Sequence, residues 1–198
     1  PMVLNSARWA IAIIIIAAIG RSEFRKDWPV LKSRLLYIFL LGTVGFTLFN
    51  VVLYNAVRYT TVINVSIEQA AMPMFIFALN FLLFRTGVGV GQIIGFLLSV
   101  VGVALTASHG DLSTLAQLQM NFGDALMMIA VIAYSGYTVA LRNKPDVHWK
   151  SLMLAMCISA FVSSIPFTMW EIAAGNAIMP TLRGYAIIAY TSLFPSLV

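Results

Sequence analysis

The chain has 198 residues, of which 61% are hydrophobic and 10% charged, and its mean hydropathy is +0.93. Soluble domains carry about 25% charged and about 45–50% apolar residues, so the composition excludes a soluble domain and predicts an integral membrane protein. The formal net charge of +5 does not indicate nucleic-acid binding, because most basic residues lie in short breaks between apolar runs.

Seven apolar runs are candidates for membrane-spanning helices, which need about 20 mostly apolar residues. The runs cover residues 2–20, 35–55, 60–84, 89–108, 122–142, 150–171 and 183–198. They are continuous and do not alternate with a period of two, so the sequence predicts an all-α polytopic membrane protein, a helical bundle rather than a membrane β-barrel. The segments between them are read as connecting loops, including the basic segment 21–34.

The basic residues are distributed unevenly between the two sides of this topology. One side holds nine of them: Arg21, Arg25, Lys26, Lys32, Arg34, Arg85, Arg142, Lys144 and Lys150. The other side holds only Arg58 and Arg183. Because cytoplasmic loops carry the excess of Lys and Arg, we expect the odd-numbered spans to run from outside to cytoplasm.

Two charges fall inside predicted spans, where a charged side chain is costly and usually faces the bundle interior. Glu68 lies about 12 Å and Arg8 about 9 Å from the outer face, at 1.5 Å per helical residue. Their similar depth and opposite charge lead to the hypothesis that they pair. Asp124 and Glu171 fall at span ends and need no such explanation.

Polar side chains also recur at helical spacing along three spans. The rows are Thr43, Thr47, Asn50 and Tyr54; Thr61, Asn64 and Glu68; and Tyr134, Tyr137 and Thr138. They indicate a shared polar cavity, or alternatively hydrogen bonds between packed helices. Both interpretations stay open for the hydroxyl and amide residues, whereas helix packing alone does not require the carboxylate of Glu68.

Helix-breaking and small residues mark the third and fourth predicted spans. Pro73 lacks an N–H for the carbonyl of Gln69, so a kink is expected beside Glu68 that either lines a transport site or is static. Gly91 and Gly95 form a small-residue stripe that favours close approach of another helix. No catalytic motif, metal-ligand cluster or cofactor fingerprint occurs, so we expect no enzyme, no metal and no cofactor. Cys157 is expected to be a buried, inert thiol.

Several segments resemble those of EamA-type transporters of the drug/metabolite transporter superfamily. In "LYNAVRYTTVINVSIEQAAMPMFIFALNFLLF", Tyr54, Ala56 and Pro73 match a segment that leads into a proline-bearing helix. "NSARWAIAIIIIAAI", with Arg8, resembles the second helix of the family, and "GQIIGFLLSVVGVAL" resembles its glycine-rich fifth helix. "GDALMMIAVIAYSGYTVALRNKP" is similar to the first helix of the second repeat. The chain departs from the family in having Arg85-Thr86 where Gly-Glu is frequent, and Glu68 matches no family signature.

The resemblance implies ten helices in two inverted five-helix repeats. On that pattern, residues 1–108 would be helices two to five of the first repeat, 109–121 an external loop, and 122–198 the first three helices of the second. The chain would then be a fragment that lacks the first helix and the C-terminal helices.

The function that we expect is secondary transport of a small metabolite across the inner membrane, outward, by alternating access, with proton coupling as an open question. The substrate-binding or coupling residues would be Glu68, Arg8, Asn50, Tyr54, Tyr134 and Tyr137, with Pro73, Gly91 and Gly95 as hinge or packing residues. The expected partners are the substrate, protons and the lipid bilayer, with a homodimer left open. The alternative is a membrane scaffold or assembly subunit that does not transport.

Overall fold

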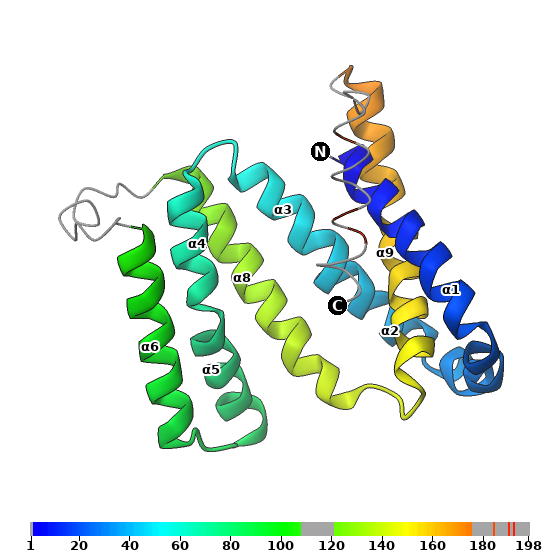
Figure 1. Ribbon diagram of the computed structural model, residues 1–198, viewed down its shortest axis with the longest axis horizontal. Helices are drawn as coiled ribbons and strands as arrows, with labels where there is room; N and C mark the ends of the chain where they lie inside the picture. The colour runs from blue at the N-terminus through cyan, green and yellow to red at the C-terminus, as the bar shows by residue number, and fades with distance from the viewer. Residues whose placement is uncertain (1, 108–120, 176–183, 185–189, 191, 193–198) are drawn as a thin grey trace. The chain divides into compact units, whose positions relative to one another are not determined.

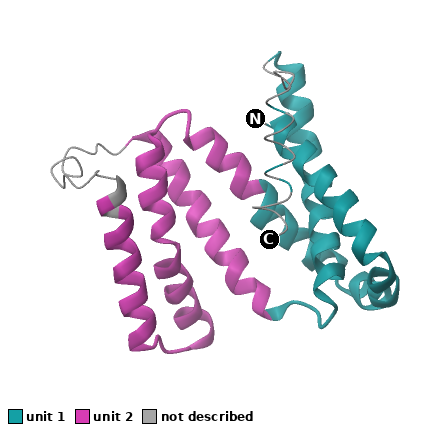
Figure 2. Ribbon diagram, in the orientation of Figure 1, with its two compact units in different colours: residues 1–47, 143–198 teal, residues 48–142 magenta. Residues whose placement is uncertain are grey.

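The computed structural model describes residues 2–107, 121–175, 184, 190 and 192. The described residues form helices joined by short turns, and no strand occurs among them. They belong to two compact units, one of residues 1–47 with 143–198 and one of residues 48–142 (Figure 2). The helical class predicted from the long continuous apolar runs is thus confirmed for the residues that the structure describes.

The first unit, residues 1–47 with 143–198, is built on α1 (Met2–Ser33), α2 (Leu35–Gly42) and α9 (Trp149–Ala173). Both α1 and α2 pack against α9, and α1 lies alongside α9 in Figure 1. Trp9, Ala12, Cys157 and Ala160 form a buried cluster between α1 and α9. Cys157 is free and fully buried, as the sequence predicted.

Hydroxyl groups supplement this apolar packing. The Ser6 hydroxyl lies 2.7 Å from that of Ser164 and 2.6 Å from that of Thr168. Thr47 donates from Oγ1 to the carbonyl of Ala160 across 2.8 Å and lies 2.7 Å from the Ser163 hydroxyl. These contacts are the interhelical hydrogen bonds that stabilise helix pairs where water is absent.

The second unit, residues 48–142, contains α3 (Phe49–Ala56), α4 (Val62–Ala70), α5 (Met72–Phe84), α6 (Val90–Ala107) and α8 (Phe122–Ala140). Helix α8 packs against α3, α4 and α5, and α6 packs against α4. Figure 1 shows α8 between α3 and the α4–α5 pair. The buried core of this unit consists of Ala56, Val65, Met127, Ala130 and Val131.

The basic segment 21–34 is not the loop that the sequence predicted, because α1 continues without a break to Ser33. Its Arg, Glu and Lys residues are good helix formers, and its aromatic side chains lie on one face. Phe24 and Trp28 contact each other with ring centroids 5.6 Å apart. The segment is therefore an amphipathic continuation of α1, a pattern typical of helices at a membrane surface.

The second predicted span is helical from Leu35 to Ala56, but residues Thr43–Leu48 are π-helical. This π segment differs from the regular α-helical spacing on which the predicted face of Thr43, Thr47, Asn50 and Tyr54 was based, so that shared face stays a prediction. Such insertions are rare and often occur at functional sites. The boundary between the two compact units falls inside it, between Thr47 and Leu48.

The third predicted span is interrupted at Ala71, which separates α4 from α5. Pro73 lies in the first turn of α5, where the N–H that it lacks would have no helical partner. The N–H of Ala71 donates to the carbonyl of Glu68 across 3.1 Å. The predicted interruption is present, but it is a break between two helices followed by a proline, rather than a kink centred on Pro73.

Five helical runs in the described part of the chain are long and apolar enough to cross a membrane. They are Met2–Ser33, Leu35–Ala56, Val62–Phe84, Phe122–Asn143 and Trp149–Ala173. In α6 the apolar stretch Val90–Val103 is shorter than such a span. The predicted loop 109–121, apart from Asn121, and most of the seventh predicted run, 183–198, lie outside the described residues.

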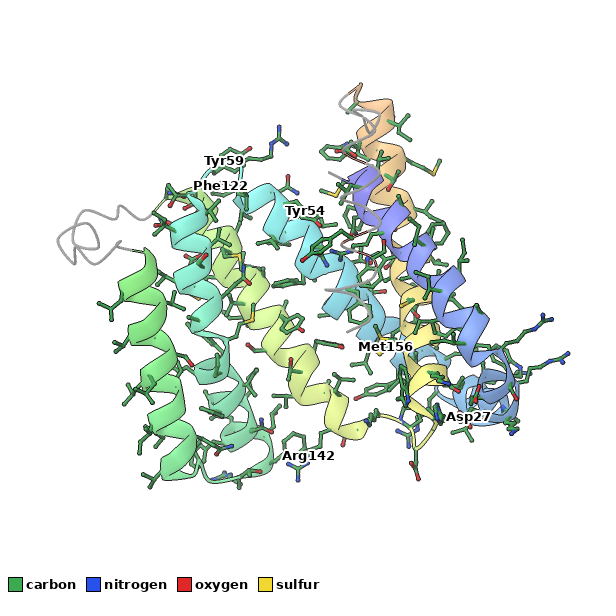
Figure 3. The ribbon with its side chains drawn as sticks, viewed as in Figure 1. Asp27, Tyr54, Tyr59, Phe122, Arg142 and Met156 are labelled. Carbon is green, nitrogen blue, oxygen red and sulfur yellow. The ribbon has the colours of Figure 1, made fainter. Side chains whose placement is uncertain are left out.

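Contacts within each unit bring predicted cytoplasmic segments together. In the first unit, Asp27 in α1 accepts the N–H of His148, at the start of α9, across 2.9 Å. In the second unit, the Arg142 guanidinium lies over the Phe84 ring and donates to Thr86 across 3.4 Å. Figure 3 shows Arg142 at one end of this unit and the Tyr59–Phe122 pair at the other. These contacts agree with the alternation of spans inferred from the basic residues.

Candidate functional site

Helix α4 carries two residues of the predicted polar row, Asn64 and Glu68, and the third, Thr61, is an exposed residue just before the helix. Its first turn is capped by Thr61, whose Oγ1 accepts the N–H of Asn64 at 3.2 Å. Asn64 is buried, and Glu68, one turn later, is partly buried. The spacing of Asn64 and Glu68 therefore does what the sequence predicted: it places an amide and a carboxylate on the same face of one helix.

Asp124, in the first turn of α8, is hydrogen-bonded to this face of α4. One carboxylate oxygen accepts hydrogen bonds from the Thr60 hydroxyl and, at 3.0 Å, from the Asn64 side-chain amide. Its other oxygen accepts the backbone N–H of Asn121 at 2.7 Å, which completes a capping box at the start of α8. Asp124 is only 3% exposed, so a residue interpreted as an ordinary span end is in fact a buried hub between α4 and α8.

The backbone comes unusually close beside this hub. A Cβ atom placed on Gly123 would lie 2.7 Å from both the carbonyl oxygen of Ala56 and the N atom of Thr60. Glycine at this position therefore lets the start of α8 meet the α3–α4 turn, which brings Asp124 within reach of its partners.

Two acceptor oxygens on the same face lack donors. Asn64 Oδ1 and Glu68 Oε2 are both buried, and neither accepts a hydrogen bond from any residue that the structure describes. Buried polar atoms normally have partners, so unsatisfied ones indicate strain or an absent ion or ligand. With the Asp124 carboxylate bonded to Asn64, this face of α4 is rich in hydrogen-bond acceptors.

The other predicted residues of this unit lie on α3 and α8. The Tyr134 ring contacts Phe49 of α3 at 4.8 Å and Tyr137 at 5.3 Å, centroid to centroid. Asn50 and Tyr137 are buried, and Tyr54 is partly buried. The structure thus joins the Tyr134–Tyr137 pair to α3 through Phe49, a residue that the polar pattern could not reveal.

Arg8 belongs to the other compact unit. It is buried to 8% exposure in α1, and its guanidinium carbon lies 4.6 Å from the centroid of the neighbouring Trp9 ring. This is a cation–π distance. Its pairing with Glu68, which is in the second unit, stays a prediction.

Gly91 and Gly95 face open space. A Cβ atom added at either position would meet no described atom within 4 Å. A helix that packs closely on this stripe is therefore still a prediction, as is the hinge role of Pro73.

A cavity of about 530 Å³ lies in the first unit and contains none of the predicted site residues. Its lining is almost entirely apolar: Phe24, Trp28, Leu35, Leu36, Ile38, Phe39, Ala155, Ile158, Ser159 and Val162. The aromatic face of the α1 continuation forms one wall, so the cavity could not be foreseen once segment 21–34 was interpreted as a loop.

Sequence reasoning missed two groups of polar residues. The first is the Asp124 hub, whose only signal was the pattern Asn121-x-x-Asp124, typical of a helix start. The second is the row of hydroxyls on α9, namely Ser159, Ser163, Ser164 and Thr168, whose recurrence near every fourth residue could have indicated a helix contact.

The apolar spans, the alternation of basic ends and the buried polar groups at span depth define a multi-pass helical membrane protein. The model of the EamA-like transporter family matches residues 1–108. The chain belongs to the EamA-like transporter family. Members of this family are transporters rather than enzymes.

The curated relatives agree with this assignment. The chain is 26% identical over 197 residues to the uncharacterized transporter YetK of Bacillus subtilis (strain 168). This alignment covers 98% of the chain and 59% of YetK. It is 23% identical over 201 residues to the uncharacterized transporter YyaM of the same strain, with 91% of the chain and 65% of the relative covered. The chain thus spans about three fifths of the length of these relatives. No solved structure matches it significantly.

Proposed function

We propose that the protein is a secondary transporter that moves a small metabolite outward across the cytoplasmic membrane by alternating access. Membership of the EamA-like transporter family carries this proposal. Buried polar groups within apolar helices support it, because such groups are costly in a membrane and are typical of substrate and ion pathways.

The proposed substrate and coupling site uses side chains from both compact units. Glu68, Asn50, Tyr54, Tyr134 and Tyr137 would come from the second unit and Arg8 from the first. Glu68 would serve either as a contact for a cationic substrate or as a proton-coupling group, while the aromatic pair on α8 would contact the substrate through its rings.

The irregular helices support the proposed movement. The α4–α5 break at Ala71 and the π segment Thr43–Leu48 interrupt two spans that carry proposed site residues. Broken helices at membrane depth are tolerated where backbone is buried in protein or lines a cavity, and they often accompany transporter binding sites. Helix rearrangement would then take place at these interruptions.

The test is a flux assay with a panel of small metabolites on the full-length protein in proteoliposomes. Glu68→Gln is expected to abolish proton-linked flux, whereas Glu23→Gln, beyond the apolar part of α1, should leave it unchanged. If no member of the panel moves, transport as the function is contradicted in favour of the scaffold alternative. If flux and its pH dependence are the same in Glu68→Gln and wild type, Glu68 is not the coupling group.

The proposed ion pair between Arg8 and Glu68 has its own test. The double variant Arg8→Glu with Glu68→Arg keeps opposite charges at the two positions, whereas each single variant leaves like charges. Recovery of membrane expression in the double variant beyond either single variant is expected. Equal loss in all three contradicts the pairing.

A further inference from the structure

We propose that Glu68 and Asn64 form a proton-binding site in which protonated Glu68 donates its O–H to Asn64 Oδ1, and that Asp124 holds Asn64 in the orientation this requires. The site itself stands on the geometry of α4 and α8. Its use in coupling rests on the proposed transport function.

The orientation of Asn64 follows from its partner. An ionised carboxylate only accepts hydrogen bonds, so the Asn64 atom that lies 3.0 Å from Asp124 Oδ1 is the donating Nδ2. The other end of the amide, Oδ1, is then an acceptor by necessity. It is buried in a residue that is only 8% exposed, and no described donor reaches it.

Glu68 is placed to supply the missing donor. It follows Asn64 by four residues on α4, a spacing at which Cβ atoms on a helix are about 5–6 Å apart. Its Oε2 is the second buried oxygen without a donor. A single proton on Glu68 satisfies both atoms, because the acid O–H donates and Asn64 Oδ1 accepts.

A proton suits this position better than a larger cation. Both oxygens are sealed from solvent, so an ammonium group or a hydrated metal ion could reach them only if the side chains moved apart. Metal ions also prefer several oxygen ligands, and no cluster of three or more metal-binding side chains occurs in the part of the chain that the structure describes.

The helices that pack against α4 carry few other ionisable side chains, so proton binding at this site depends on the carboxyl group of Glu68. Helices α5 and α6, which pack on α4, carry no ionisable side chain. Helix α8 contributes Asp124, whose carboxylate is already bonded to Asn64, and Tyr134 and Tyr137, whose rings contact each other. Ionised Glu68 would meet the like charge of Asp124 without any described cation to offset it within these helices.

The proton can be observed directly by infrared difference spectroscopy on the full-length protein in lipid nanodiscs as the pH is varied. A protonated carboxylic acid has a carbonyl stretch that is distinct from those of carboxylate and amide groups. The other Asp and Glu residues also protonate at low pH, so the Glu68 band is the part of the signal that is present in the wild type and absent in Glu68→Gln. A Glu68 that stays ionised over the whole pH range, or identical spectra of Glu68→Gln and wild type, overturns the proposal.

The partner is tested by the frequency of that band. Asn64→Leu removes the acceptor, so the carbonyl stretch should shift to higher frequency as the acid loses its hydrogen bond. Asn64→Ser, whose side chain is too short to replace the amide oxygen, should give the same shift and serves if the leucine variant does not fold. Asn80→Leu is the matched control, because Asn80 donates to the Ile76 carbonyl within α5. An unshifted band in both Asn64 variants overturns the role of Asn64.

The spectroscopic and flux results separate the two proposals. If the Glu68 band and its shift are found but Glu68→Gln transports with unchanged pH dependence, the proton site stands and proton coupling through it fails. If the band is absent while Glu68→Gln abolishes flux, transport stands, and Glu68 acts by contacting the substrate.

Discussion

The side-chain amide of Asn64 in α4 donates to the carboxylate of Asp124 in α8 across 3.0 Å, at the point where the α3–α4 turn meets the start of α8. The same carboxylate accepts the Thr60 hydroxyl and the N–H of Asn121. One buried charge thus ties together three segments of the second unit, and it fixes the orientation of the amide beside Glu68.

Replacing Asp124 should destabilise the protein strongly. Asp124→Ala leaves the Asn64 amide and the Asn121 N–H without an acceptor and removes one of the two hydrogen bonds of the capping box, so we expect the free energy of unfolding to fall by about 2–4 kcal/mol. Reversible unfolding of the full-length protein in mixed micelles measures the change. Asp146→Ala, at an exposed position between α8 and α9, should stay within about 0.5 kcal/mol of wild type. Equal effects of the two substitutions would contradict the stabilising role of the Asp124 hydrogen bonds.

Gly42 should not tolerate a methyl group. A Cβ there would lie 2.6 Å from the Met156 carbonyl oxygen and 2.7 Å from Ser159 Cβ, so Gly42→Ala forces α2 and α9 apart. We expect a loss of about 1–3 kcal/mol in the free energy of unfolding.

The control for this substitution is another helical glycine. A Cβ on Gly136 in α8 meets no described atom within 4 Å, so Gly136→Ala should leave stability unchanged or raise it by up to about 1 kcal/mol through helix propensity. Thermal unfolding of both variants in detergent compares them. A Gly42→Ala variant as stable as Gly136→Ala contradicts the close contact.

Two threonine-to-valine substitutions in the π segment should differ in their effect on stability. Thr47→Val removes the bond to the Ala160 carbonyl and the contact with Ser163, at a cost of about 1 kcal/mol. The Thr43 hydroxyl is buried without a partner among the described residues, so Thr43→Val should be neutral or stabilising. Unfolding midpoints of the two variants in the same detergent give the comparison. A reversed order of stability would mean that the two hydroxyls are bonded differently.

Cysteine labelling tests both the burial of Cys157 and the orientation of the chain. The native thiol is fully buried, so wild-type protein should not react with a membrane-impermeant maleimide. In a Cys157→Ala background, Arg58→Cys should react in intact cells, and Lys144→Cys only after the membrane is permeabilised. Reaction of Lys144→Cys from outside would reverse the inferred topology.

The candidate site could be predicted only in part. The row of Thr61, Asn64 and Glu68 was visible because helical spacing is a property of one segment. Asp124 was placed correctly at a span end, but its burial depends on Thr60 and Asn64, and these contacts cannot be read from the spacing of residues along a single helix. The ring of Phe49 beside Tyr134 was invisible for the same reason.

The helical class and the presence of apolar runs long enough to cross a membrane followed from the residues alone. Hydropathy over about 20 residues is a local quantity, so it indicates these features before any helix meets another. The location of Lys and Arg is also local, and the direction of the chain that it predicts stays a prediction. The continuation of α1 to Ser33, the π segment at Thr43–Leu48 and the unsatisfied oxygens of Asn64 and Glu68 required the folded chain. Each depends on contacts within the folded units, since burial, hydrogen-bond partners and helix irregularities are set by neighbours that lie far away in the sequence.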